Sequence, residues 1–497
     1  MTNTRNNQPQ LWQCLETWRQ QSPDFVARVA AGMPMPVALR YLALQLWQEG
    51  RLADAIGILR HVVMLAPGQA QPMAELASLL VATDRNVEAL NYLASSLQLN
   101  PNQPAAWLTV ATICVAAGDL SSAENAFRTT LELDPSSVEA ITGLGLLHIR
   151  LVRFSEAVAH LEAAVNRGVN APSVYACLGE AHFHTGDFKR ALGPLRKAVE
   201  ALPEEGAIAR KFALAALVVT AIEYTVEDAL RAYQAAAGQH AQNVESVLRT
   251  SFQVLCGYGY REAGIRVGAA LIERFPGDAV IGYQLDALRG RAKGPAPSDV
   301  IAAGFDRYAE TFEDHLTGVL GYDLPAQAYA VLADTGISYS RLLDLGCGTG
   351  LAGSSLHALG GFLIGVDVSQ KMLEKAAVRG NYDRLVQGDA IQYLSDNDEY
   401  FDLVVALDLA GYIGPLAPLF AAVASRLTPG GLFIVSIESA ACEECELRPS
   451  GRFVHNPDAM LALATSRFSV ITKLSTTLRH EANNPVSGTL ALFRLRP

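Results

Sequence analysis

The stretch "LLDLGCGTGLAG", Leu342–Gly353, places four glycines within eight residues directly behind an apolar run. Glycine lets a ligand lie close to the backbone and adopts conformations that other residues avoid. Two glycine patterns overlap here: G-x-G-x-G begins at Gly346, and the dinucleotide pattern G-x-G-x-x-G begins at Gly348. In a dinucleotide fold the first glycine follows the strand at once, and the strand predicted here, "RLLDL", ends at Leu345. The frame Asp344-x-Gly346-x-Gly348-x-Gly350 is therefore the better one.

Beyond this loop, apolar runs of four to six residues alternate with helical stretches. The runs are "RLLDL", "FLIGVDV", "DRLVQ", "FDLVVAL" and "LFIVSI". This alternation is typical of a parallel, doubly wound sheet. The last two runs, "FSVITKLSTTL" and "GTLALFRL", have no helix between them and should pair antiparallel. The prediction is an α/β Rossmann-like domain with a seven-stranded, mostly parallel sheet and an antiparallel C-terminal strand.

Acidic residues follow the next two predicted strands. Asp367 ends the second strand in "GVDVS" and can accept both hydroxyls of a ribose, with Val368 beside it. Asp389 follows the third strand in "GDA", with Ala390 next to it, where an adenine amino group would lie. Met372, on the helix after Asp367, is spaced to cover the adenine, and packing in the core is the alternative interpretation.

These motifs resemble those of the class I S-adenosylmethionine-dependent methyltransferases, over residues 301–497. The similarity is greatest to the branch fused to tetratricopeptide repeats, whose leader matches "FDRYAETFEDHLTGVLGYDLP", Phe305–Pro325. The resemblance implies S-adenosylmethionine as cofactor and places Tyr308 and His315 in a lid over it. The cofactor-binding residues it implies are Tyr308, Asp344, Gly346, Gly348, Gly350, Asp367, Val368, Met372, Asp389 and Ala390.

Candidate catalytic residues should lie at the carboxyl edge of the sheet. Asp408 and Tyr412 follow the fourth strand in "ALDLAGYIG". His455 follows the fifth strand, where some oxygen methyltransferases of the family keep a base; a structural or surface histidine is the alternative. Members that modify nucleobases or amides carry an Asn/Asp-Pro-Pro-aromatic motif at Asp408, and its absence here argues against DNA, RNA or glutamine amides as substrates.

The first 290 residues contain a repeat of 34 residues. Five alanines keep this step, and small residues recur twelve positions before each of them, where two helices must cross closely. The alanines are Ala55, Ala89, Ala123, Ala157 and Ala191. Glycines such as Gly118 fall between the predicted helices, and prolines such as Pro135 fall where the second helix of a pair stops. Each unit is predicted to be a helix hairpin.

The repeats resemble the tetratricopeptide family, most clearly in "AAWLTVATICVAAGDLSSAENAFRTTLELDP". The predicted organisation is an N-terminal helical segment (1–35), five repeats (36–205), degenerate helical repeats and a cap (206–290), a linker (291–300) and the methyltransferase domain (301–497). The family's repeats line a groove, here with residues such as Trp47 and Phe183, which implies a peptide or protein as substrate or partner. Packing against a neighbouring element is the other interpretation of those residues.

Composition excludes several classes of protein. Half of the 497 residues are hydrophobic and 18% are charged, which is typical of a packed soluble protein. The net charge of −11 argues against nucleic acid as a partner, and the longest apolar run, Phe212–Ile222, is too short to span a membrane. Seven scattered cysteines fit a reducing compartment, so a cytoplasmic location is expected. Cys442 and Cys445 form one C-x-x-C without a second pair, and no metal is expected.

The leading hypothesis is a methyltransferase that modifies a peptide or protein side chain presented by the repeats. A small-molecule oxygen or nitrogen methyltransferase whose repeats serve assembly is the first alternative, and a non-catalytic scaffold that senses the cofactor is the second. An oxidoreductase is the least favoured interpretation. Oxygen and nitrogen acceptors share these motifs, so the sequence leaves the acceptor atom open.

Overall fold

The structure is a computed structural model that describes residues 27–28, 31–310, 312–313, 316, 321–481 and 484–497. Two compact units make up the chain, Met1–Cys177 and Leu178–Pro497, and the boundary between them falls within helix α11 (Pro172–His184). Most of the predicted N-terminal helical segment lies outside the described residues. None of the helices in the described ranges is long and apolar enough to cross a membrane.

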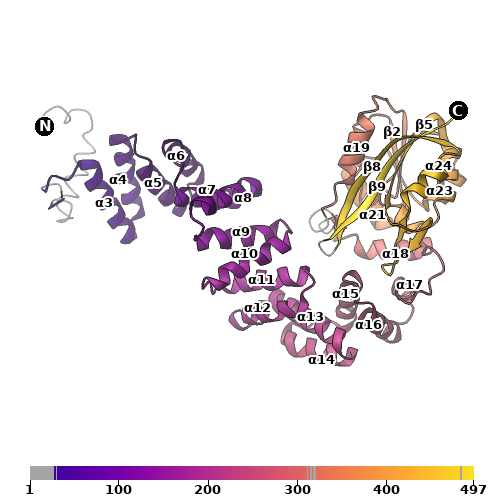
Figure 1. Cartoon of the computed structure of the whole chain (residues 1–497), viewed down its shortest axis with the longest axis horizontal. Helices are drawn as coiled ribbons and strands as arrows, with labels where there is room; N and C mark the ends of the chain where they lie inside the picture. The colour runs from indigo at the N-terminus through magenta and orange to yellow at the C-terminus, as the bar shows by residue number, and fades with distance from the viewer. Residues whose placement is uncertain (1–26, 29–30, 311, 314–315, 317–320, 482–483) are drawn as a thin grey trace. The chain divides into compact units, whose positions relative to one another are not determined.

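The first unit consists of successive helix pairs, which Figure 1 shows in the indigo to magenta part of the chain. Their order is α3 (Met35–Gln48), α4 (Leu52–Leu65), α5 (Ala70–Ala82), α6 (Asn86–Leu99), α7 (Pro104–Ala117), α8 (Leu120–Leu133), α9 (Val138–Arg150) and α10 (Phe154–Asn166). The pairs begin at intervals of 34 or 35 residues, which confirms the predicted hairpin repeat.

The repeating small residues lie where the helices of a pair touch. All five alanines of the 34-residue series are completely buried. At the earlier small position, a methyl group added to Gly145 would lie 2.6 Å from the Leu161 side chain, and one added to Gly179 would lie 2.4 Å from Leu195. A larger residue at these sites would push the two helices apart, which explains why the repeat keeps alanine or glycine there.

The turn inside each hairpin uses a left-handed residue at the same repeat position. Gly50, Gly118 and Gly186 have φ of +76°, +80° and +80°, and the two intervening repeats place Asp84 and Val152 there with φ of +59° and +58°. A left-handed backbone crowds the Cβ atom of an L residue, most severely for a β-branched one. Val152 is therefore a strained position in an otherwise regular array.

We predict that Val152→Gly raises the stability of the protein. Removing the Cβ atom relieves a left-handed strain of about 1–2 kcal/mol in the folded state. Glycine also makes the unfolded chain more flexible, which lowers stability by only about 0.5–1 kcal/mol. The reciprocal change, Gly118→Val, places the same side chain at the matching position of the preceding repeat, where a Cβ atom meets nothing within 4 Å. Thermal unfolding should show a higher midpoint for the first variant and a lower one for the second. A lower midpoint for Val152→Gly would contradict the strain.

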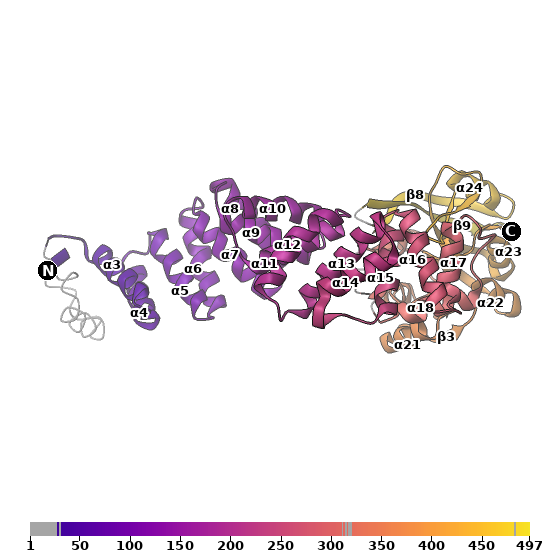
Figure 2. The same ribbon diagram turned by 90° about the horizontal axis from the view of Figure 1, so that it is seen from below.

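The second unit begins with further helices. These are the rest of α11, then α12 (Phe188–Ala201), α13 (Gly206–Glu223), α14 (Val226–Ala237), the short η1 (Gly238–His240), α15 (Val244–Gly257), α16 (Arg261–Arg274) and α17 (Ala279–Leu288). Pro194 lies inside α12. Figures 1 and 2 both show α17 beside α18 (Ser298–Tyr308), with which it is in contact. Helix α18 begins inside the predicted linker, and the predicted domain boundaries stay a prediction.

A seven-stranded sheet follows, in the order β3-β2-β1-β4-β5-β9-β8. Its strands are β1 (Arg341–Leu345), β2 (Phe362–Asp367), β3 (Arg384–Gln387), β4 (Phe401–Ala406), β5 (Leu427–Glu438), β8 (Phe468–Glu481) and β9 (Asn484–Leu495). The first five are parallel, and β9 runs antiparallel to both β5 and β8. The predicted fold class is therefore confirmed. A two-stranded hairpin of β6 (Cys445–Leu447) and β7 (Phe453–His455) is inserted after β5.

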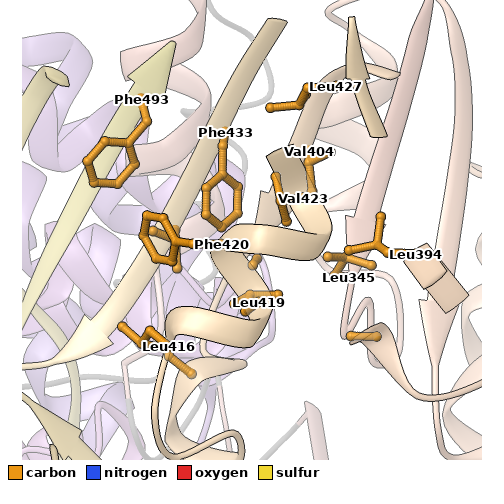
Figure 3. Packing of buried hydrophobic residues seen from close by; sticks show 14 of the residues in the cluster. Leu345, Leu394, Val404, Leu416, Leu419, Phe420, Val423, Leu427, Phe433 and Phe493 are labelled. Carbon is orange, nitrogen blue, oxygen red and sulfur yellow. The ribbon is translucent and has the colours of Figure 1, made fainter. Parts of the chain in front are cut away.

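Helices cover the sheet: α19 (Leu324–Ala333), α20 (Gly353–His357), α21 (Gln370–Arg379), α22 (Ala390–Asp396), α23 (Ala417–Arg426) and α24 (Pro457–Ala464). One face is closed by α23, whose Phe420 ring packs edge-to-face on Phe433 of β5 and Phe493 of β9 (Figure 3). Both strand rings are fully buried. This apolar layer holds the strands in register, so that β1, β2, β3 and β4 all end at one edge.

Candidate active site

The loop after β1 is shaped by its glycines. Gly346, Gly348 and Gly350 have φ of +72°, +55° and +82°, a conformation that few other residues adopt. The amides of Gly346 and Cys347 donate to the carbonyl of Val366, at 2.8 and 3.1 Å, so the loop is fastened to the end of β2. A Cβ atom at Gly350 would lie 3.2 Å from Ala376 of α21. The absence of a side chain at Gly350 therefore lets α21 pack closely against the loop.

Asp367 closes the loop from the neighbouring strand. Its carboxylate accepts the amide of Gly348 at 2.9 Å and that of Ser369 at 2.8 Å. Burial raises the pKa of this carboxyl group above its usual range, although the two backbone amides work against that rise. The acid that was predicted to bind a ribose therefore also holds the glycine loop in place.

Asp344 lies at the end of β1 and is only 2% exposed. The hydroxyl of Tyr382 donates to its Oδ2 atom at 2.7 Å. Burial raises the pKa of Asp344 to about 7, against the lowering effect of that hydrogen bond. Near neutral pH this carboxyl group therefore changes charge easily.

Asp389 caps the next helix. One carboxylate oxygen accepts the amides of Ile391 and Gln392, both at 3.0 Å, and the other accepts the hydroxyl of Ser298 at 2.9 Å. Ser298 is the first residue of α18, so this bond ties the start of α18 to the third strand's loop. The predicted adenine contact thus already has partners on both oxygens.

These residues meet in one cavity of about 860 Å³. This volume lies in the upper part of the range for small-molecule sites, roughly 300–1,000 Å³. Of the predicted site residues, the structure brings eleven to its wall: Tyr308, Asp344, Gly346, Gly348, Asp367, Val368, Met372, Asp389, Ala390, Asp408 and Tyr412. Gly350 and His455 are not part of the wall.

His455 lies in β7 and is 1% exposed. Its Nε2 atom is 2.7 Å from the carbonyl of Gly414 and therefore donates to it. Burial lowers the pKa of the imidazole. This bond fixes the ring, which is set back from the cavity wall. A general base must reach the proton it removes, so the role of His455 stays a prediction. Asp408 and Tyr412 lie on the cavity wall, whereas His455 does not.

An aromatic group from α18 and the segment after it lies against the cavity. Phe305 packs edge-to-face on Tyr412 with centroids 5.3 Å apart, and Tyr308 packs in the same way on Phe312 at 5.2 Å. Burial raises the pKa of the Tyr308 phenol, so it stays protonated. His315, the other residue of the predicted lid, lies outside the described residues.

Asp408 and Tyr412 belong to an ionic network that their sequence positions did not reveal. Arg452, from the β6–β7 hairpin, donates to Asp408 at 2.7 Å and to the Tyr412 hydroxyl, and its guanidinium lies 4.6 Å from the centre of the Tyr412 ring. Arg479 of β8 also donates to Asp408, at 3.1 Å. Asp408 itself has φ of +55°, a conformation uncommon outside glycine that often occurs at functional sites.

Residues of α15 and α17 also line the cavity, and the sequence analysis did not anticipate them. They are Arg249, Thr250, Gln253, Val280, Ile281, Tyr283 and Gln284. Arg249 and Arg307 of α18 both pair with Asp278, which in turn caps α17 through the amides of Val280 and Ile281. The polar residues on α15 carry no motif, so only the folded chain shows their position.

The buried Asp344 should make stability depend on pH. Its pKa is about 7 in the native state against 3.8 for an ordinary aspartate, so between about pH 4 and 7 the native state holds a proton that the unfolded state has lost. The free energy of unfolding therefore falls as pH rises through this window, by at most about 1.4 kcal/mol per pH unit.

Asp344→Asn removes the titrating group and should flatten this dependence. Thermal unfolding of the two proteins from pH 5 to 8 gives the comparison: the melting midpoint of the variant should fall less with rising pH. Parallel curves for the two proteins would show that Asp344 is not the group responsible.

Two family models match the chain. Residues 343–435 match a model described as a methyltransferase domain, and residues 16–248 match one described as the C-terminal domain of cilia and flagella-associated protein 70. The ubiquinone biosynthesis O-methyltransferase of Azorhizobium caulinodans is 34% identical over 103 residues, which are 19% of this chain and 39% of that protein. The enzyme of the same name from Bradyrhizobium diazoefficiens is 34% identical over 102 residues, with the same coverage. The chain thus spans well under half the length of these curated relatives.

Solved structures are similar to each part. The N-methyltransferase NodS of Bradyrhizobium japonicum, bound to S-adenosyl-L-homocysteine, is 18% identical with a TM-score of 0.30, covering 34% of this chain and 85% of that one. The magnesium protoporphyrin IX methyltransferase of Synechocystis, with bound cofactor, is 16% identical with a TM-score of 0.32, covering 40% and 97%. YrrB, described as a tetratricopeptide protein with an unusual peptide-binding site, is 16% identical with a TM-score of 0.35, covering 39% and 96%.

Proposed function

We propose that this chain, a tetratricopeptide-type repeat array followed by a class I methyltransferase domain, uses S-adenosylmethionine to methylate a side chain of a peptide or protein that its last repeat helices hold. The proposal has two parts. The first concerns the cofactor at the glycine loop, and the second concerns the acceptor at the opposite side of the same cavity.

The donor groups around the glycine loop support the cofactor. Asp367 and Asp389 offer carboxylate acceptors at the ends of β2 and β3, at positions suited to a ribose and an adenine, and Met372 also lies on the cavity wall. Asp344 is suited to the ammonium group of the cofactor's amino-acid part, whose positive charge would favour the ionised carboxylate. S-adenosylmethionine supplies a methyl group already activated on a sulfonium.

Since the cofactor carries the reactivity, the protein contributes alignment and exclusion of water. The rings of Phe305, Tyr308 and Phe312 form an apolar wall, and Asp408 and Tyr412 face the cavity beyond them. These groups would line the space in which an acceptor is aligned for methyl transfer. Asp408 and the hydroxyl of Tyr412 would orient the acceptor by hydrogen bonds.

The single observation that carries the second part is the shared cavity. Helices α15 and α17, which continue the repeat array, form its wall together with the methyltransferase domain. An acceptor bound in this cavity can therefore contact α15, whose Thr250 and Gln253 are exposed there. A peptide held by these helices would be delivered to the site without a further binding surface.

A small-molecule acceptor is the second candidate. The cavity volume lies within the range of small-molecule sites, and the curated relatives are named for a small-molecule pathway. In this alternative the same wall of α15 and α17 encloses the acceptor instead of presenting a peptide.

Asp367→Ala should remove cofactor affinity. The loss of two charge-assisted hydrogen bonds to ribose, at roughly 1.5–3 kcal/mol each, weakens binding by about 100-fold or more. Titration calorimetry with S-adenosylhomocysteine on the full-length protein measures it. Asp383→Ala is a control at the start of β3, where the carboxylate accepts the amide of Leu363 and does not line the cavity. Equal affinity of Asp367→Ala and the wild type would refute the cofactor site.

A second prediction separates the two acceptor classes. Cell lysate is incubated with full-length enzyme and methyl-labelled S-adenosylmethionine, then divided into protein and small-molecule fractions. We expect the label in protein. Label confined to small molecules would favour the alternative, and absence of label from both fractions would contradict catalysis.

The wall of the cavity can be tested with a matched pair of glutamines. Gln253→Trp places a bulky ring at the α15 wall and should lower kcat/KM for the labelled acceptor about tenfold, equivalent to about 1.4 kcal/mol. Gln234→Trp makes the same change at an exposed position of α14 outside the cavity wall and should have no effect. Affinity for S-adenosylhomocysteine should be equal in both. Equal kcat/KM for the two variants would exclude α15 from the acceptor's path.

A further inference from the structure

Five charged side chains form a cluster where β4, β5 and β8 end, here called the ionic cluster: Asp408, Glu438, Arg452, Arg479 and Glu481. Asp408, Arg452, Arg479 and Glu481 line the cavity. Arg479 is 2% exposed, so the cluster is a built part of the domain rather than a surface patch. Although burial opposes its ionisation, the two guanidinium groups hold the pKa of Glu438 below its usual range.

Every guanidinium nitrogen of the ionic cluster already donates to another member or to Tyr412. Arg452 donates from Nε to Glu438 at 2.7 Å, from Nη1 to the Tyr412 hydroxyl and from Nη2 to Asp408 at 2.7 Å. Arg479 donates from Nε to Glu481 at 2.8 Å, from Nη1 to Asp408 at 3.1 Å and from Nη2 to Glu438 at 2.6 Å and to Glu481 at 2.5 Å. Each guanidinium nitrogen of the cluster therefore directs at least one N–H group to a partner within it or to Tyr412.

The carboxylates, by contrast, use only one oxygen each. All of these bonds end on Oδ1 of Asp408, Oε1 of Glu438 and Oε1 of Glu481. Among the described residues, no donor to the second oxygen of Asp408 or Glu481 is found, and both side chains line the cavity. The cluster also holds three carboxylates against two guanidinium groups. It thus presents hydrogen-bond acceptors and an excess negative charge to a ligand.

The aromatic wall favours the same kind of ligand. Phe305, Tyr308 and Phe312 line the cavity and contact one another edge to face. The face of an aromatic ring attracts a cation, and desolvated cation–π contacts are worth about 2 kcal/mol. An anionic ligand would meet both the ring faces and the unused carboxylate oxygens, next to guanidinium groups that already face three carboxylates. The chemistry of this part of the cavity therefore disfavours carboxylates and phosphates.

We propose that the methyl acceptor is an amine, which enters as an ammonium group recognised by Asp408, Glu481 and the aromatic wall. This inference rests on the proposed methyltransferase function and names its substrate class. The ammonium loses one proton to a cavity carboxylate or to water. The nitrogen lone pair then forms a bond to the methyl carbon as the carbon–sulfur bond breaks, and that electron pair stays on sulfur. The products are the N-methylammonium group and S-adenosylhomocysteine.

The test uses chemical blocking of amines. Full-length enzyme is incubated with methyl-labelled S-adenosylmethionine and two portions of the same cell lysate, one untreated and one whose primary and secondary amines have been acetylated and the reagent removed. Label should enter the untreated portion and survive strong acid hydrolysis, which cleaves esters and keeps N–CH₃ bonds. Acetylation should abolish it.

Each other outcome is decisive. Equal labelling of the acetylated portion, or label released by hydrolysis as methanol, would overturn the amine while leaving a methyltransferase. Absence of label from both portions would contradict the proposed function and the amine together. These results distinguish failure of the inference from failure of the function on which it rests.

A substitution tests whether the ionic cluster recognises the ammonium group of the acceptor. Glu481→Gln removes one cavity carboxylate and should raise KM for the labelled acceptor about tenfold, while the affinity for S-adenosylhomocysteine stays equal to that of the wild type. Glu446→Gln is the matched control: the Glu446 side chain is 51% exposed against 46% for Glu481, also pairs with an arginine, and lies outside the cavity wall. An unchanged or lower KM for Glu481→Gln would refute recognition by this carboxylate, and equal weakening by both variants would show a general charge effect.

Discussion

The hydrogen bond from the Gly348 amide to the Asp367 carboxylate connects the first two strands of the sheet at the point where a ligand meets them. It can form only because β1 and β2 run parallel and end at the same edge, and because the glycine accepts φ of +55°. The bond fixes the loop that faces the cavity and orients the Asp367 carboxylate. The shape of this edge therefore follows from the topology of the sheet and one backbone conformation.

Helix α18 joins this edge to the helices that precede it. On one side, Ser298 donates to Asp389, and Asp306 accepts the hydroxyl of Ser369 and the amide of Lys371 at the start of α21. On the other side, Arg307 pairs with Asp278 at the start of α17. The same short helix thus contacts the loops after β2 and β3 as well as the start of α17. Residues of α15 and α17 line the same cavity as those two loops.

Much of this architecture could be predicted from local patterns. The 34-residue period reflects the tight helix crossings, which require a small residue at a fixed step. The glycine frame is recognised by its distance from the preceding strand. Both features can therefore be read from residue spacing. The ionic cluster leaves no such trace, because Asp408, Arg452 and Arg479 come from three distant segments. His455 shows the opposite case: its place after the fifth strand predicts a base, and no local pattern predicts the β6–β7 hairpin in which its ring bonds to the Gly414 carbonyl. The position of the α15 residues on the cavity wall depends on tertiary packing, so no local sequence pattern predicts it.

The central claim is that the glycine loop binds the cofactor and that α18 transmits the effect of this binding to α17. Hydrogen–deuterium exchange on the full-length protein, with and without S-adenosylhomocysteine, tests it directly. The account predicts slower exchange in residues 346–350 and in α18, extending to the amides of Val280 and Ile281 that Asp278 caps. Unchanged exchange in residues 346–350 at saturating S-adenosylhomocysteine would contradict it.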